Sequence, residues 1–177
     1  VVRGCVEHGL SSLVIASMHM DDASTGLCRM LDSGVRGIEL ADTVGVVLAQ
    51  RLVRKLCDEC ATGAELSTED RGIVARVCAA QGQDASLLPA RYRKAEGCDV
   101  CNQTGYRGRM ALFEALILTP GVETALGAGN LDADRLRRIA VAEGMQTIGM
   151  DGVEKAAAGI TTVREIRRVA DGLLKRY

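Results

Sequence analysis

Two Cys-x-x-Cys pairs constrain the fold of this chain more than any other feature of its sequence. The pairs are Cys57 with Cys60 and Cys98 with Cys101. Zinc prefers four tetrahedral ligands, and each Cys-x-x-Cys turn can offer two thiolates to one ion. Such an ion would clamp the ends of the 61–97 segment together and add stability that a small irregular module lacks. The pattern therefore predicts one structural zinc ion held by these four cysteines.

A redox dithiol is the alternative interpretation of a Cys-x-x-Cys pair. It would normally stand singly at a helix start in a thioredoxin-like context, and the sequence offers no such context. Gly97 and Gly105 flank the second pair, which suits a tight knuckle whose backbone amides turn toward sulfur. Four thiolates leave no open coordination position, so the metal is expected to be structural and not catalytic.

The other cysteines favour a reducing compartment. Cys5, Cys28 and Cys78 stand alone, and an odd total of seven fits a secreted disulfide framework poorly. We expect a cytoplasmic protein in which the three lone cysteines act as small buried apolar residues. The apolar runs are far shorter than the roughly 20 residues that span a bilayer, so no transmembrane segment is expected.

The charge and the aromatic content of the chain argue against one class of partner, nucleic acid. The formal net charge is −1 and aromatic residues make up 2% of the chain. Neither bulk electrostatic attraction to nucleic acid nor stacking on its bases is supported, and no nucleic-acid partner is expected. The hydrophobic content of 47% is ample for a buried core.

Hydrophobic periodicity predicts alternating elements in the first third of the chain. Residues 1–10 have the spacing of a helix end, and the apolar run at 12–18 predicts a strand buried in a parallel sheet. A helix is expected from Asp22 to Leu31, with Asp22 as its cap and Gly34 just beyond its end. The apolar stretch at 38–56 is divided into a helix to about Ala49 and a strand from about Leu52.

The rest of the chain is expected to be mainly helical. A capping box from Ser67 to Asp70 predicts a helix in the segment between the cysteine pairs, and residues 81–94 have the composition of a loop. A strand is predicted at 110–118. Three further helices are expected at 132–143, at 148–158 and after Thr162.

Two segments carry a family resemblance. Residues 47–57 (VLAQRLVRKLC) and 97–109 (GCDVCNQTGYRGR) resemble the ATPases of type II secretion and type IV pilus assembly. In that family the first segment closes a RecA-like core, and the second is the distal half of a tetracysteine zinc motif. Residues 17–22 (SMHMDD) resemble the family's histidine box, with departures at Met18, Met20 and Asp21. The resemblance extends from about Gly9 to Leu174.

The resemblance implies a fold class and a division of the chain. The class is α/β: the C-terminal fragment of a RecA-like P-loop NTPase core, followed by a zinc-clamped module and an α-helical tail. Residues 1–56 would be the core fragment, 57–109 the tetracysteine module with a helical arm, and 110–177 a mainly helical C-terminal subdomain. The family further implies that this chain is part of a longer protein, here called the full-length parent, which would form a homo-hexamer in the cytoplasm. Platform and adaptor proteins would hold this parent peripherally at the inner membrane, and it would bind ATP and Mg²⁺.

The resemblance also nominates site residues. His19, in the histidine box, is the candidate catalytic residue, because the carboxyl end of a strand is where α/β sheets bind ligands. Periodicity alone would make His19 a hydrogen-bonded residue at a strand end. Arg51 and Arg54 are candidates for nucleotide binding across the site or subunit boundary, with solvated surface arginines as the alternative.

A phosphate-binding loop is missing from the sequence. No lysine follows a glycine, so no Gly-x-x-x-x-Gly-Lys-Ser/Thr motif is present, and no acidic cluster ends an apolar strand to hold magnesium. We therefore expect that the chain begins inside a larger protein and does not hydrolyse ATP alone. A stand-alone zinc-ribbon module that binds a protein partner is the alternative function. The sequence leaves secretion and pilus assembly equally open.

Overall fold

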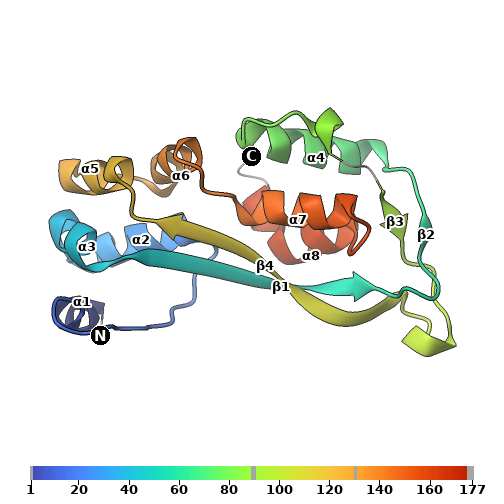
Figure 1. Ribbon diagram of the computed structural model, residues 1–177, viewed down its shortest axis with the longest axis horizontal. Coiled ribbons are helices and arrows are strands. Elements are labelled where there is room, and N and C mark those ends of the chain that lie inside the picture. Colours follow the sequence, from blue (N-terminus) through green and yellow to red (C-terminus); the bar gives the residue numbers. More distant parts are fainter. Residues whose placement is uncertain (1, 89–90, 130, 175–177) are drawn as a thin grey trace. The chain divides into compact units, whose positions relative to one another are not determined.

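The computed structural model describes residues 2–88, 91–129 and 131–174 (Figure 1). In chain order the elements are α1 (Val2–Gly9), α2 (Ala23–Asp32), α3 (Gly37–Thr43), β1 (Val46–Leu56), β2 (Thr62–Gly63), α4 (Thr68–Ala80), the 3-10 turn η1 (Ala85–Leu87), β3 (Arg93–Lys94), the 3-10 turn η2 (Asp99–Cys101), β4 (Tyr106–Ile117), α5 (Pro120–Ala128), α6 (Ala133–Ala142), α7 (Ile148–Ala157) and α8 (Val163–Leu174). Within these residues, none of the helices combines the length and apolarity needed to cross a bilayer.

Local sequence explains where many of the helices begin. Five N-cap side chains accept a hydrogen bond from a backbone N–H of the first helical turn. They are Asp22 before α2, Ser67 before α4, Asp132 before α6, Thr147 before α7 and Thr162 before α8. Helix α5 instead starts with Pro120, whose missing N–H costs nothing at the first helical position.

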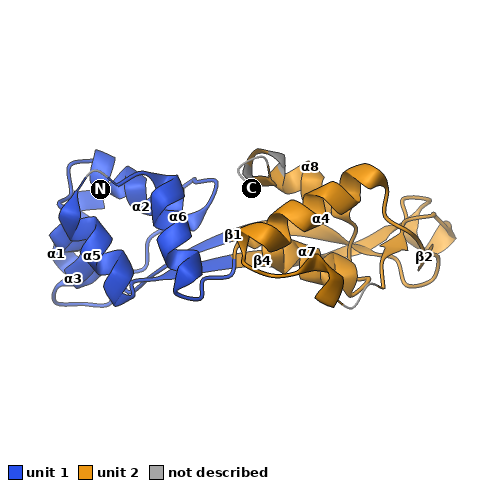
Figure 2. Ribbon diagram, turned by 90° about the horizontal axis from the view of Figure 1, so that it is seen from above, with its two compact units in different colours: residues 1–49, 114–146 blue, residues 50–113, 147–177 orange. Residues whose placement is uncertain are grey.

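The chain divides into two compact units that interleave along the sequence (Figure 2). Unit 1 comprises residues 1–49 and 114–146, and unit 2 comprises 50–113 and 147–177. Strands β1 and β4 pair in a two-stranded sheet, and each starts in one unit and ends in the other. The arrows of Figure 1 show that the two strands run in opposite directions.

Unit 1 is a helical cluster built on leucines. Leu27 of α2, Leu40 of α3, Leu126 of α5 and Leu136 of α6 are all buried in one core. Helices α3 and α5 approach so closely that a Cβ on Gly37 would overlap the backbone of Leu126. A glycine is therefore required at the start of α3.

An ion pair is buried in the same unit. Arg137 Nη2 donates to Asp22 Oδ2 at 2.6 Å, and the backbone N–H of Thr25 donates to Asp22 Oδ1 at 2.7 Å. Burial opposes ionisation of Asp22, but the bonds from Thr25 and Arg137 outweigh it and lower the pKa of that carboxyl. The pair joins the start of α2 to α6.

Unit 2 packs α4, α7 and α8 beside the second half of β1 and most of β4. The core of this unit contains side chains that are at most 1% exposed: Ile148, Met150 and Val153 of α7, Leu112 of β4 and Ile166 of α8. The short strands β2 and β3 form a separate antiparallel pair, in which Thr62 lies opposite Lys94 and Gly63 opposite Arg93. The sequence-predicted helices of this unit, at 148–158 and after Thr162, are confirmed.

The predicted strand at 12–18 is wrong. This segment has no regular secondary structure, and Leu13 and Ile15 are 91% and 89% exposed. An apolar run indicates that burial would be favourable, but a strand also needs a neighbour with which to exchange backbone hydrogen bonds. Within the described residues, no strand pairs with this segment.

The division of 38–56 also differs from the prediction. Helix α3 ends at Thr43, and β1 begins at Val46, six residues before the expected start at Leu52. The β-branched pair Val46–Val47 favours extended backbone, and Gly45 precedes it. The strand predicted at 110–118 is confirmed as β4 but begins at Tyr106, while α5 was not predicted.

Candidate functional site

The four paired cysteines come from two turns that meet in unit 2. Cys57 follows the last residue of β1, and Cys60 lies three residues on in the same turn. Cys98 precedes η2, and Cys101 ends it. The backbone N–H of Cys57 donates to the carbonyl of Gly105 at 3.0 Å, which joins the two turns.

The sulfur atoms have the spacing of one tetrahedral site. The Sγ–Sγ distances are 3.9 Å from Cys57 to Cys98, 3.8 Å from Cys60 to Cys101 and 3.7 Å from Cys98 to Cys101. All four atoms lie within 4.8 Å of one another. Zinc–sulfur bonds of roughly 2.3 Å give a tetrahedron with edges of about 3.8 Å. The four cysteines could therefore hold a metal ion.

Backbone amides support the sulfur atoms. The N–H groups of Cys98 and Gly105 donate to Cys101 Sγ, both at 3.2 Å, and that of Gly97 donates to Cys60 Sγ at 3.4 Å. Hydrogen bonds of this kind stabilise the thiolate form that binds metals. The expected turning of amides toward sulfur beside Gly97 and Gly105 is confirmed.

Glycine is required at both of these positions. Gly97 and Gly105 have φ angles of 121° and 74°, a region that side chains rarely adopt. A Cβ on Gly105 would lie 2.5 Å from the Cβ of Ala95, and one on Gly97 would lie 2.8 Å from the carbonyl oxygen of Gln103. The second knuckle can close only because these positions lack side chains.

The thiols of the tetrad differ in acidity. For Cys101, burial raises the pKa, but the amide bonds from Cys98 and Gly105 and the neighbouring thiols lower it to about 6. For Cys60, burial and the contacts with the neighbouring thiols raise the pKa to about 11 despite the amide of Gly97. A metal ion would remove this asymmetry, because each coordinating thiol loses its proton.

The lone cysteines lie apart from this site. Cys78 is buried, whereas Cys5 and Cys28 are only partly buried. The thiol of Cys28 donates to the carbonyl of Leu131 at 3.7 Å, and burial raises its pKa to about 11. The expectation of full burial is thus confirmed for Cys78 alone.

His19, the candidate catalytic residue, is exposed in the irregular segment before α2. His19 was nominated because it was expected to lie at the carboxyl end of a strand, and within the described residues no strand ends there. Its catalytic role stays a prediction.

The two candidate nucleotide-binding arginines occupy different settings on β1. Arg51 is partly buried, and its Nη1 donates to the carbonyl of Gln50 at 3.4 Å. Arg54 forms a bidentate pair with Glu165 of α8, through Nε to Oε1 at 3.0 Å and Nη2 to Oε2 at 2.7 Å. Its guanidinium carbon lies 4.1 Å from the centre of the Tyr106 ring. Contact of either arginine with a nucleotide stays a prediction.

Nothing in the sequence pointed to the carboxylate that holds Arg54. A helix was expected after Thr162, and the backbone N–H of Glu165 does donate to Thr162 Oγ1 at 3.0 Å. Its buried side chain also accepts from Arg168, at 2.9 Å from Nε and 2.7 Å from Nη2. Spacing of three along a helix predicts the Arg168 contact, but nothing local predicts the one to Arg54.

Comparison with known proteins gives a consistent result. A sequence model of the family described as type II/IV secretion system protein matches residues 8–168. The chain is 35% identical over 154 residues to the type IV pilus assembly ATPase PilB of Thermus thermophilus, and 36% identical over 157 residues to the type II secretion system protein HxcR of Pseudomonas aeruginosa. It is 32% identical over 159 residues to the type II secretion system protein E of Aeromonas hydrophila.

These alignments cover most of this chain and a minority of each relative. They include 87%, 89% and 89% of the chain, but 16%, 28% and 29% of the three relatives, respectively. The chain thus spans less than a third of the length of each of these proteins.

Proposed function

This chain belongs to the type II/IV secretion system protein family, and on that premise we propose that it is the C-terminal portion of an ATPase that powers type II protein secretion or type IV pilus assembly. The observation that carries the proposal is the extent of the match, residues 8–168. A stand-alone zinc ribbon would share only the cysteine turns and the arm between them. Similarity through unit 1 and α7 favours the ATPase.

The proposed role of the tetrad is structural. Four cysteine sulfurs that lie within 4.8 Å of one another, three pairs of them at 3.7–3.9 Å, suit zinc, which prefers this donor set and geometry. Cys57, Cys60, Cys98 and Cys101 would hold the ion with no open position for substrate. The ion would fix the turn after β1 to the turn before β4, and so hold the 61–97 arm in place.

The remaining functions belong to the full-length parent. We propose that the parent is a homo-hexamer in the cytoplasm, docked on inner-membrane platform and adaptor proteins, and that it binds ATP together with Mg²⁺. Residues 1–56 would complete its RecA-like core, 57–109 would form its zinc module and 110–177 its C-terminal subdomain. The chain alone would not hydrolyse ATP, because a phosphate-binding loop and a magnesium carboxylate are missing from its sequence.

Site residues of the parent follow from the same proposal. His19 would act beside the nucleotide in the parent, where the 12–18 segment would pack against the rest of the protein. The exposure of Leu13 and Ile15 supports this, since such packing would bury them. Arg51 and Arg54 would lie near the nucleotide or the subunit boundary.

A segment exchange tests the proposal. The residues of the Thermus thermophilus pilus assembly ATPase that align with this chain would be replaced by it, and the same would be done in the Aeromonas hydrophila secretion protein. ATP hydrolysis and export or pilus assembly would be measured in each. We expect hydrolysis in at least one exchange protein, and the system that regains assembly identifies the class to which the chain belongs.

The control is the same exchange protein with Cys57 and Cys60 replaced by serine. It should lose zinc and assembly while the parent's nucleotide-binding half still binds ATP. Folded exchange proteins that bind ATP, keep zinc and yet hydrolyse nothing in either background would contradict the proposal.

A further inference from the structure

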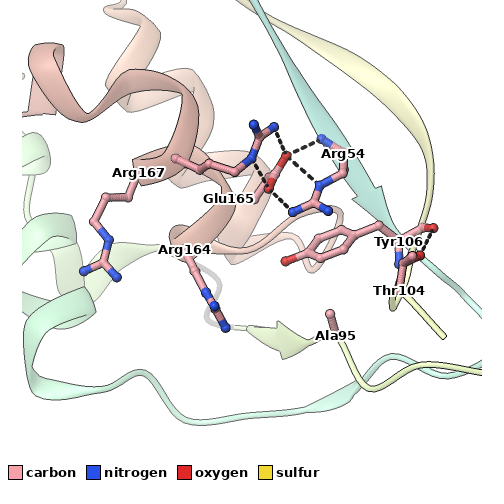
Figure 3. A pocket seen from close by; sticks show the side chains of 8 residues that line it. Arg54, Ala95, Thr104, Tyr106, Arg164, Glu165 and Arg167 are labelled. Carbon is pink, nitrogen blue, oxygen red and sulfur yellow. Dashed lines mark hydrogen bonds and ion pairs between the residues drawn. The ribbon is translucent and has the colours of Figure 1, made fainter.

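We propose that an arginine-lined pocket of unit 2 binds an anion carrying adjacent phosphate groups, such as pyrophosphate or the diphosphate of a nucleotide. The pocket has a volume of about 630 Å³. Figure 3 shows it between the first turns of α8, β1 and the start of β4. The inference goes beyond the proposed function, which places Arg54 near a nucleotide but assigns no pocket, and it uses only residues of one compact unit.

The pocket carries an excess of positive charge. Its lining includes Arg54, Arg164, Arg167 and Arg168 against a single carboxylate, Glu165. Because Glu69 of α4 also pairs with Arg167, two positive charges remain without a carboxylate. Ligand pockets of 300–1,000 Å³ are common, but most are lined by apolar groups. Guanidinium groups are the side chains that best match phosphate, because each presents a planar fork of N–H donors.

Glu165 is already engaged by two of these arginines. Both of its oxygens already accept from Arg54 and Arg168, and Oε1 also accepts from the backbone N–H of Arg54 at 3.1 Å. The carboxylate is 1% exposed, so it is sealed beneath the two arginines. The Nη1 groups of Arg54 and Arg168 remain without a partner among the described residues.

Arg164 is the arginine with most to offer a ligand. It is exposed, and within the part of the chain that the structure describes no side chain pairs with it. In Figure 3 its side chain extends away from α8 toward the segment that carries Ala95. Arg167, by contrast, is paired with Glu69 of α4.

The position of Arg164 is unfavourable for the helix itself. It lies in the first turn of α8, where the helix dipole disfavours a cation. It also shares a face with Arg167 and Arg168 at spacings of three and four, at which like charges repel. An arginine in this unfavourable position, with no side-chain partner among the described residues, is better explained by ligand binding than by fold stability.

Phosphate chemistry fits this pocket better than carboxylate chemistry. One carboxylate carries a single charge and would balance half of the surplus, whereas adjacent phosphates carry two or more negative charges. Glu165, the carboxylate among the described lining residues, has no free oxygen for a metal ion, because both of its oxygens accept from arginines. Tyr106 lines the wall opposite α8, and its hydroxyl bonds with Thr162 Oγ1 at 3.0 Å, which holds the ring in place.

Titration calorimetry on the zinc-loaded chain tests the inference, with inorganic pyrophosphate in magnesium-free buffer of low ionic strength. We expect saturable binding that Arg164→Ala weakens at least tenfold and Arg164→Lys weakens less. Arg138→Ala is the matched control, since Arg138 is an exposed arginine of α6 in unit 1. That variant loses the same charge and should bind within twofold of the unchanged chain.

A second arm uses ADP in place of pyrophosphate. Tighter binding of ADP that depends on Arg164 identifies a nucleotide diphosphate as the ligand, and equal affinities identify free phosphate.

A folding control accompanies these measurements. Because the position of Arg164 is unfavourable for its helix, the melting temperature of Arg164→Ala should be no lower than that of the unchanged chain. Amide NMR shifts of the unchanged chain offer a readout free of mutation, and they should move at Thr104, Tyr106 and Arg164. Absence of saturable binding, equal loss in Arg138→Ala, or shifts confined to other residues would overturn the inference.

Discussion

The carboxylate of Glu165 and the guanidinium of Arg54 form a two-point pair, with Nη2–Oε2 at 2.7 Å and Nε–Oε1 at 3.0 Å, although 111 positions separate them in the chain. The pair links β1 to the first turn of α8. A second contact lies beside it, because the backbone carbonyl of Arg54 accepts a hydrogen bond at 2.9 Å from Oγ1 of Thr161, which lies just before α8. Helix α8 is therefore attached to β1, the strand that leads into Cys57.

Replacing Glu165 by glutamine should destabilise unit 2. Glutamine keeps the shape but loses the charge that two arginines share, and hydrogen bonds to charged groups are each worth about 1.5–3 kcal/mol. Because Arg54 and Arg168 are partly exposed, we expect a loss of about 2 kcal/mol in the free energy of unfolding. Urea unfolding of the zinc-loaded chain measures it. Glu59→Gln, on an exposed carboxylate, is the control, and equal stability of both variants would contradict the expectation.

The same pair predicts a pH dependence. Burial raises the pKa of Glu165, but the bonds from Arg168 and Arg54 outweigh it and bring the pKa to about 2. The pKa of a glutamate in an unfolded chain is about 4.3. Since the folded pKa is the lower one, the contribution of Glu165 to stability is complete above about pH 5 and is lost as the pH falls toward 2. The melting-temperature difference between the unchanged chain and Glu165→Gln should therefore shrink over this range. A constant difference would argue against the assignment.

The chain should contain about one zinc per polypeptide, because its two pairs of thiolates complete one tetrahedral shell. Metal analysis of reduced, unchelated protein measures this, and a content below about a tenth would contradict it. Cys98→Ser should release the metal and raise hydrogen exchange in the 61–97 arm. Cys78→Ser, in a buried cysteine outside the tetrad, is the control that should keep the metal. The amides of α2 and α6 should exchange as before in Cys98→Ser.

Two glycines near the tetrad separate backbone strain from steric overlap. Gly105 and Gly108 have similar φ angles, 74° and 79°, but only at Gly105 would a Cβ meet another residue, Ala95. Gly108→Ala should cost about 1 kcal/mol, the typical penalty for a side chain in this region. Gly105→Ala should cost more and weaken zinc binding, because the amide of Gly105 supports Cys101. Competition with a chelator measures zinc affinity, and equal effects of both variants would show that overlap with Ala95 is unimportant.

His19→Ala is predicted to act only in the full-length parent. We expect ATP affinity to change little and hydrolysis to fall by roughly 10²-fold, the usual effect of losing one positioned polar group. Binding and turnover would be measured on one preparation, with circular dichroism as a check of folding. His8→Ala, in α1, serves as the matched histidine control. Unchanged turnover in His19→Ala would make His19 a residue without a role in coupling.

Much of the local structure could be predicted from the sequence. Asp22, Ser67 and Thr162 cap helices as expected, because a cap involves residues only two or three positions apart. The tetrad was likewise predictable, since the Cys-x-x-Cys spacing sets the geometry of each half and the donor type defines the ligand chemistry. The resemblance to secretion and pilus ATPases was carried by contiguous residues, so the family match confirmed it.

The tertiary structure decided what depends on distant partners. The apolar composition of 12–18 indicated that burial would be favourable, but not which strand could pair with it, so the strand prediction failed. The interleaving of two units, and the pairing of Arg54 with Glu165, were also beyond prediction. Caps and cysteine turns depend on short-range geometry that a few neighbouring residues determine. Strand partners and buried ion pairs depend on which distant segments the folded chain brings within hydrogen-bonding distance, and that is set by the packing of the entire unit.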